Sequence, residues 1–174
     1  IGICGWGGIA LNAAALDPRI KATLATTLYV MTRVATKGYF DADDSADKRM
    51  AARQAMAAQR TLDYANGTYA RAGGVVDPLP ADLPQFVADY HAYYKTARGF
   101  HARSGNSTDG WNATSSLSWM NTNLLQFASE IENPVMVLHG EKAHSRYMGE
   151  GAFDLLTGDN KELLIVPGAS HTDL

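Results

Sequence analysis

Two residues near opposite ends of the sequence have side chains that could perform nucleophilic catalysis. Cys4 lies in the glycine-rich stretch GICGWGG at residues 2–8 and is the only cysteine of the 174 residues. His171 ends the stretch PGASH at residues 167–171. A thiol with a histidine base can attack carbonyl carbons and form a covalent acyl intermediate. We therefore expect Cys4 to be a nucleophile and His171 to be its general base.

The surroundings of Cys4 favour a nucleophile turn, which needs a strand, a sharp turn and a helix in this order. Residues 1–4 are typical of the end of a buried strand, and the Ala- and Leu-rich residues 9–16 predict a helix. Gly2 provides the small residue that such a turn needs two positions before the nucleophile. Trp6 stands where a second small residue belongs, and the Gly-Gly pair after it can compensate for its bulk.

A cysteine at the start of a helix has its thiolate stabilised by the helix dipole and by the N–H groups of the first turn. The N–H of Gly5 is then the candidate oxyanion donor. Two other interpretations of this stretch stay open. Cys4 can be a buried residue that only packs, or the glycine turn can bind phosphate, although the G-x-G-x-x-G spacing and the P-loop lysine are absent.

The segment LHGEKAHS at residues 138–145 is the expected place for an acid that orients the histidine. Glu141 is its only carboxylate and therefore our candidate. Alternatively, Glu141 pairs with Lys142 or Arg146 and no acid is present. His144 is a candidate substrate contact, although a plain exposed loop residue is the simpler interpretation.

Aromatic side chains in the middle of the chain could form a substrate pocket. Tyr90 and Tyr94 recur at helical spacing, and Trp119 follows in a later helix. We expect these three, together with Trp6 and His144, to contact the substrate. An aromatic stripe at this spacing is also typical of an ordinary core.

The elements that must position these residues form two α/β ends around a helical middle. The opening predicts strand, turn, helix and strand, and the middle contains helix signals and no strand signal. The expected strands are 1–4, 20–29, 135–139 and 161–166; the expected turn is 5–8; the expected helices are 9–16, 45–65, 85–98, 116–131 and 146–156; the expected loops are 73–84, 101–112 and 167–171.

The fold class expected from this order is α/β, with a mostly parallel sheet flanked by helices. Residues 1–34 would form the part of the core that holds the nucleophile, residues 35–132 a helical cap insertion, and residues 133–174 the C-terminal part of the core. Both ends of the sequence fall close to predicted elements, so we expect further N-terminal strands to be missing from this chain. The exposed sheet edges could then pair two copies in a homo-oligomer.

Composition excludes several classes of function. A net charge of −3 without a basic cluster argues against nucleic acid. No apolar run approaches the roughly 20 residues of a membrane helix, so a cytoplasmic location without a membrane partner is expected. The histidines lack zinc-ligand spacing, and neither a metal nor a cofactor is expected.

The stretches IGICGWGGIALNAAALDPRIKA, NPVMVLHGEKAHS and LLIVPGASHTDL resemble the α/β-hydrolase superfamily, specifically bacterial dienelactone-hydrolase-like proteins with a helical cap. The resemblance implies hydrolysis of an ester, lactone or thioester by a Cys, His and Asp triad. It fits Cys4 and His171, whereas Ala143 occupies the slot of the Asp. The alternative function is a catalytically degenerate α/β-hydrolase-fold module that binds a small molecule or a protein.

Overall fold

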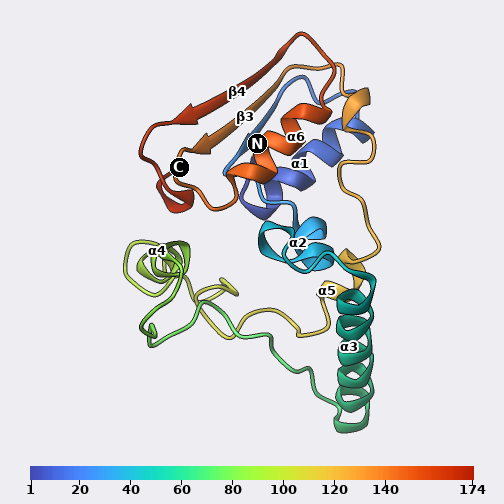
Figure 1. The fold of residues 1–174 in the computed structure, drawn as a ribbon, viewed down its shortest axis with the longest axis vertical. Helices are drawn as coiled ribbons and strands as arrows, with labels where there is room; N and C mark the ends of the chain where they lie inside the picture. Colours follow the sequence, from blue (N-terminus) through green and yellow to red (C-terminus); the bar gives the residue numbers. More distant parts are fainter. The chain divides into compact units, whose positions relative to one another are not determined.

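The computed structural model describes residues 1–174 and contains one parallel four-stranded sheet (Figure 1). Its strands are β1 (Gly2–Ile3), β2 (Thr23–Thr26), β3 (Val135–Gly140) and β4 (Lys161–Val166), and they lie in sequence order. Parallel neighbours need crossover connections. Two of the crossover connections contain a helix that packs against the sheet. Helix α1 (Gly5–Leu16) connects β1 to β2, and helix α6 (Arg146–Leu155) connects β3 to β4. The predicted α/β class with a parallel sheet is confirmed.

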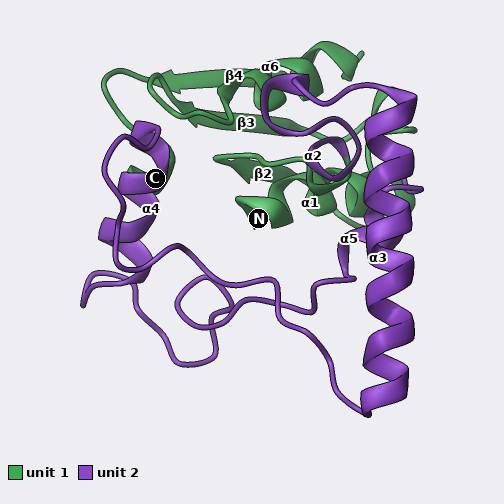
Figure 2. Ribbon diagram, turned by 60° about the horizontal axis from the view of Figure 1, so that its bottom comes forward, with its two compact units in different colours: residues 1–32, 123–174 green, residues 33–122 purple.

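The chain divides into two compact units, coloured separately in Figure 2. Unit 1 contains residues 1–32 and 123–174, and unit 2 contains residues 33–122. All four strands belong to unit 1. Because the strands are parallel, their carboxyl ends share one edge of the sheet, and Cys4, Thr27, Glu141 and the loop of His171 all follow strands at that edge.

Unit 1 has an apolar core between the sheet and its helices. Helix α1 packs against β1 and β2, and α6 packs against β3 and β4. Apolar side chains from each of these layers are buried: Leu11, Ala25, Leu28, Val137, Met148 and Ala152. The alternation of buried residues in β3 and the burial of one stripe of α6 explain why both elements could be predicted from periodicity.

The predicted turn at residues 5–8 is wrong, because α1 already begins at Gly5. The sharp change of direction takes place at Cys4 alone, which has a φ of 55°. The glycines serve close packing instead. A Cβ added at Gly2 would lie 2.2 Å from the carbonyl oxygen of Trp6, and one at Gly7 would lie 3.0 Å from the Cα of Leu28. The helix can therefore sit almost against the backbone of the sheet.

Unit 2 is helical and irregular. Helix α2 (Met31–Lys37) leads into it and was not predicted. Helix α3 (Ala46–Asn66) has Ser45 as N-cap, whose side chain accepts from the Lys48 N–H, and Gly67 as a left-handed C-cap. The sequence predicts an N-cap at Ser45 or Asp44 and a stop at Asn66-Gly67, and the structure uses Ser45 and Gly67. Helix α4 (Gln85–Tyr94) begins as predicted and is four residues shorter.

The predicted helix at residues 116–131 is mostly wrong. The structure has α5 (Ser116–Trp119) and, much later, a 3₁₀ turn at Ala128–Glu130. The side chain of Asn123 accepts the Leu125 N–H at 3.2 Å. Such a local side-chain bond offers the backbone an alternative to a helix, which is why Asn favours turns. A run of apolar residues here does not become one continuous helix.

The loops of unit 2 pair through their backbones. The Ala72 N–H donates to the Trp111 carbonyl at 2.8 Å, and the Ala113 N–H donates to the Ala70 carbonyl at 2.8 Å. A Cβ at Gly110 would lie 2.1 Å from the Gly73 carbonyl oxygen. The predicted loops 73–84 and 101–112 are therefore irregular, but glycines let them approach each other closely.

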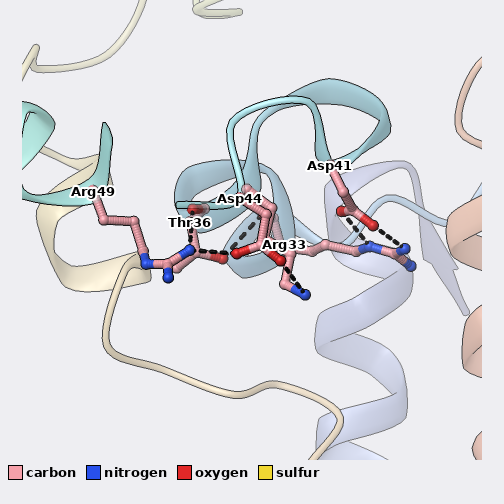
Figure 3. A network of polar contacts seen from close by, with 6 residues as sticks. Arg33, Thr36, Asp41, Asp44 and Arg49 are labelled. Carbon is pink, nitrogen blue, oxygen red and sulfur yellow. Dashed lines mark hydrogen bonds and ion pairs between the residues drawn. The ribbon is translucent and has the colours of Figure 1, made fainter. Parts of the chain in front are cut away.

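A network of charged residues fixes the start of unit 2 (Figure 3). The Arg33 guanidinium donates to both carboxylate oxygens of Asp41, at 2.9 and 2.6 Å. Asp44 accepts from Arg49 at 2.5 Å and pairs with Lys37 at 3.0 Å. These pairs surround the turn at residues 38–41, where Phe40 and Asp41 have φ values of 56° and 57°. The side-chain pairs thus hold a backbone that propensity alone disfavours.

No helix of the structure is both long enough and apolar enough to span a bilayer.

Candidate active site

Cys4 sits in a strained backbone conformation between β1 and α1. Its φ of 55° and ψ of −125° lie in a region that residues other than glycine rarely adopt. The Cys4 N–H donates to Thr26, and the Cys4 carbonyl accepts from both Gly7 and Tyr29, each bond being 2.9–3.0 Å long. Strain of about 1–3 kcal/mol persists only where the surroundings enforce it, and it clusters at functional sites. Here β2 and the first turn of α1 enforce it.

Cys4 is also the N-cap of α1, and no side-chain bond caps this helix. The first N–H groups of a helix have no intrahelical acceptor. The N–H of Gly5, the first helical residue, therefore lies directly beside the half-buried Cys4. The roles of Cys4 as nucleophile and of Gly5 as oxyanion donor stay predictions.

The bulky residue two positions after Cys4 does not obstruct this turn. Trp6 is 69% exposed. The close approach to the chain after β2 is made by the glycines that follow it, since a Cβ at Gly8 would lie 3.2 Å from the Tyr29 carbonyl oxygen. The departure of Trp6 from the small-residue pattern is therefore compatible with the strand, turn and helix geometry.

His171 lies on the loop after β4 and is 6% exposed. It begins a 3₁₀ turn, His171–Asp173, which is closed by a capping box between Ser170 and Asp173. The preceding loop is tied to the segment after β3, because the Lys142 N–H donates to the Ala169 carbonyl at 2.9 Å. These bonds fix the position of the imidazole.

The ring nitrogen Nδ1 of His171 lies 2.7 Å from the hydroxyl oxygen of Ser145. Glu141, the residue expected to orient His171, makes a different contact: its carboxylate accepts the backbone N–H of Gly168 at 2.8 Å. Glu141 thus fixes the loop that carries His171, whereas Ser145 contacts the imidazole itself. Ser145 is not among the residues predicted from the sequence, although its position two residues after Ala143, in the loop expected to hold the acid, was the available signal.

Three buried histidines lie around this position. His144 is 9% exposed, and its ring centroid lies 5.0 Å from that of His171. His139 is completely buried on β3. Burial, together with the neighbouring His144 and His139, lowers the pKa of His171 to about 3. Burial likewise lowers the pKa of His139 to about 4, so both rings are neutral at pH 7.

A series of contacts joins the two candidate residues along the carboxyl edge of the sheet. The Tyr29 N–H bonds to the Cys4 carbonyl. The Tyr29 ring lies 6.3 Å from that of His144, which in turn lies beside His171. Unit 1 therefore gathers Cys4, Tyr29, His144 and His171 at one edge. His144 is buried, so the interpretation of an exposed loop residue is wrong.

Three of the aromatic residues expected to contact substrate, Tyr90, Tyr94 and Trp119, lie in unit 2, whereas Trp6 lies in unit 1. Tyr90 and Tyr94 have ring centroids 5.9 Å apart on α4, and Phe86 meets Tyr90 edge to face at 6.2 Å. Trp119 ends α5. Phe86, Tyr90 and Tyr94 thus form an aromatic row on α4, and these three side chains and Trp119 are each half-buried.

No group of three or more His, Cys, Asp or Glu side chains has an arrangement that could hold a metal ion.

No protein-family model matches the chain. It is 47% identical over 175 residues to the uncharacterized protein PA2218 of Pseudomonas aeruginosa, which covers all of this chain and 46% of that protein. The crystal structure of PA2218 matches 99% of this chain and 53% of that structure, with a TM-score of 0.94. The uncharacterized protein YcjY of Escherichia coli is 27% identical over all of this chain and 56% of its own length. The chain thus spans about half the length of the curated relatives it matches.

Solved structures with lower identity show the fold. The α/β hydrolase GrgF from Penicillium matches 99% of this chain and 55% of its own, with a TM-score of 0.67 and 19% identity. The fold is that of the α/β hydrolases. A monoacylglycerol lipase from Paleococcus ferrophilus shares the α/β-hydrolase fold at a TM-score of 0.55, with 18% identity over 98% of this chain and 58% of its own. The strand, strained turn and helix around Cys4 have the order of the nucleophile turn in this fold.

Proposed function

We propose that this chain carries the nucleophile and the general base of a hydrolase that cleaves carboxylic ester, lactone or thioester bonds through Cys4 and His171. The observation that carries the proposal is the backbone of Cys4, the only cysteine, which is strained at the junction of β1 and α1. A structural cysteine needs no such conformation. A nucleophile does, because the sharp turn presents its side chain at the edge of the sheet.

The reaction that this arrangement supports is acyl transfer in two steps. The Cys4 sulfur attacks the carbonyl carbon while its proton passes to His171, and the carbonyl electron pair moves onto oxygen. When the intermediate collapses, the bond to the leaving oxygen or sulfur breaks, and His171 returns the proton to that leaving group. Water then attacks the acyl-thioester with His171 as base, which releases the acid and restores the thiol.

The N–H of Gly5 is placed to stabilise the oxyanion of both tetrahedral intermediates. One such donor is worth roughly 10²–10³ in rate in well-studied enzymes. The role of Glu141 in this scheme is indirect, since its carboxylate holds the Gly168 N–H and thereby the loop of His171.

Unit 2 is proposed to be the cap that determines the substrate. Its aromatic row, including Tyr90 and Tyr94, offers an apolar surface to an acyl or leaving group. Trp119, Trp6 and the buried His144 are further proposed contacts. Support for this assignment comes from the fold, since α/β hydrolases share a catalytic core and vary in the segments inserted between its strands.

The test uses the purified full-length protein with nitrophenyl esters, a lactone and an acyl thioester. Cys4→Ala should reduce turnover by a factor of about 10³ or more, and Gln54→Ala on the exposed surface of α3 serves as the control with unchanged turnover. Mass spectrometry after rapid quenching should find the acyl group on the peptide that contains Cys4. Turnover that survives Cys4→Ala would remove Cys4 from the mechanism. No turnover of any substrate, together with a thiol that alkylates only after unfolding, would favour the non-catalytic binding module.

A further inference from the structure

We propose that Ser145 positions His171 through an uncharged hydrogen bond, in the place where a carboxylate is expected, so that Cys4 and His171 rest as a neutral thiol and a neutral imidazole. The proposal deepens the proposed function, since it concerns the base of the same reaction. Ser145 is a positioning residue because it contacts the imidazole, and nothing in its placement brings it to the reacting carbon.

The contact is short and enclosed. The Ser145 oxygen lies 2.7 Å from Nδ1 of His171. Ser145 is completely buried, and His171 is 6% exposed. A hydrogen bond in such surroundings is electrostatically stronger than one in water, and breaking it leaves a buried polar group unsatisfied. The ring is therefore held in one orientation.

The position of Ser145 at the start of α6 provides independent support. Ser145 is the N-cap of this helix, yet its side chain makes no capping bond. A serine at an N-cap ordinarily accepts a backbone N–H of the first turn, which is worth about 1 kcal/mol. Here the hydroxyl is turned to His171 instead. Helix α6 therefore lacks the stabilisation of an N-cap bond, because the hydroxyl that could form it contacts the imidazole. A local loss of stability of this kind is typical of a functional side chain.

The segment around Ser145 is rigid enough to serve this purpose. Three backbone hydrogen bonds of 2.9–3.1 Å hold it. The N–H groups of Ala143, Arg146 and Met148 donate to the backbone carbonyls of Gly140, Ala143 and Ser145, respectively. These bonds form a continuous series of turns from the end of β3 into α6. The Ser145 hydroxyl is thus placed by backbone on both sides.

The tautomer follows from the role of the ring. If His171 is the base, Nε2 must carry the lone pair, so Nδ1 must carry the proton and donate it to the Ser145 oxygen. A hydroxyl accepts this bond without charge. An imidazolium therefore gains less from Ser145 than it would from a carboxylate, because bonds to ionised acceptors are about twice as strong.

The surroundings of the ring favour the same neutral state. Burial lowers the pKa of His171, and so do two neighbouring histidines, His144 beside it after β3 and His139 on β3 itself. A thiolate and imidazolium pair is consequently not the resting form. Proton transfer from Cys4 to His171 then accompanies the attack on the substrate.

The first experiment measures the protonation state of His171 in the natural protein. Nitrogen NMR of the histidine side chains in the full-length protein, assigned with His171→Gln, should show His171 as the Nδ1–H tautomer at pH 7. An Nε2–H tautomer or an imidazolium at this pH would overturn the proposal. The result does not depend on any substrate, so it separates the failure of this inference from the failure of the proposed hydrolase activity.

The second experiment compares Ser145→Ala with Ser118→Ala, whose hydroxyl is exposed on α5. Ser145→Ala should lower kcat roughly 10-fold with KM unchanged, and Ser118→Ala should change neither. Circular dichroism confirms that both variants fold. A normal kcat in folded Ser145→Ala would overturn the proposal.

The third experiment replaces the Ser145 hydroxyl with a carboxylate, in the variant Ser145→Asp. Because Cys4 is the only cysteine, alkylation by iodoacetamide measures its ionisation directly. Ser145→Asp should lower the apparent pKa of alkylation by about one unit or more relative to the natural protein, because a carboxylate stabilises the imidazolium that forms when Cys4 ionises. An apparent pKa that is the same in Ser145→Asp and in the natural protein contradicts the proposal that the uncharged partner of His171 sets its protonation state. If Ser145→Asp does not fold, the NMR and kcat measurements still decide.

Discussion

Units 1 and 2 are stabilised by different forces. Almost every buried apolar side chain belongs to unit 1, and Met120 is the single buried apolar residue of unit 2. In contrast, unit 2 contains the Arg33–Asp41 pair and the network around Asp44. The candidate nucleophile and base therefore lie in the unit that has the apolar core, whereas the region proposed to select substrates depends more on polar contacts, which respond to salt and pH.

The largest expected difference concerns one leucine from each unit. Leu11 on α1 is 1% exposed, and Leu62 on α3 is 54% exposed. Leu11→Ala should lower the free energy of unfolding by about 2–5 kcal/mol, because it leaves a cavity in the core. Leu62→Ala should change it by less than about 0.5 kcal/mol. Urea unfolding followed by circular dichroism measures both, and equal effects would contradict the comparison.

Two glycines provide the next contrast. Gly2→Ala places a Cβ 2.2 Å from a backbone oxygen of α1, so we expect a loss of about 1–3 kcal/mol together with reduced activity, since Cys4 must shift. Gly67→Ala at the end of α3 meets no atom within 4 Å and is strained only by its φ of 62°. It should cost about 1 kcal/mol and leave alkylation of Cys4 unchanged. Thermal unfolding and iodoacetamide kinetics separate the two effects.

Mild acid should destabilise unit 1 before unit 2. The folded pKa values of His171 and His139, about 3 and about 4, lie below the ordinary value of 6.5. The unfolded state therefore binds more protons below pH 6.5, so stability is full above that pH and falls as the pH drops toward 4. The slope is at most about 1.4 kcal/mol per pH unit for each histidine.

The stability that unit 2 gains from its carboxylates is lost only at lower pH. Hydrogen bonds from Arg33 hold the pKa of Asp41 below its ordinary value, so the stability it provides is present above about pH 4 and is lost as the pH falls further. Hydrogen exchange measured by mass spectrometry at pH 7, 5 and 3 resolves the two units. Earlier exposure of α3 than of β3 at pH 5 would contradict this order.

The smallest expected effect is that of one ion pair. Asp41→Asn removes the charge that Arg33 contacts through two hydrogen bonds. We expect a loss of about 0.5–1 kcal/mol in unit 2 that shrinks in 1 M salt. Asp17→Asn, which removes the partner of the highly exposed Arg19, is the matched control with no measurable effect. A loss that salt does not reduce would show that packing, not charge, holds the turn.

The sequence predicted the elements whose local signals agree with their surroundings. Ser45 and Gly67 mark the ends of α3 because caps act through neighbouring backbone groups. Strand β4 matches its prediction from residue 161 to 166. The prediction failed at residues 116–131, where local Asn bonds compete with a helix, and at α2, which has no strong periodic signal. Such short segments are decided by tertiary contacts, because propensity is a weak prior.

The sequence by itself determined the α/β class and two local arrangements: a strand followed by a helix around residues 2–8, and a strand at residues 161–166 followed by the loop of His171. It also determined Cys4 and His171 as candidates, because all of these depend on local patterns and chain order. Only the tertiary structure decided what contacts the imidazole. In the structure, the Ser145 hydroxyl contacts Nδ1 of His171, the Glu141 carboxylate accepts the Gly168 N–H, and His144 is buried. Side-chain direction at the end of a strand depends on the packing of several loops at once, and a linear pattern does not contain that information.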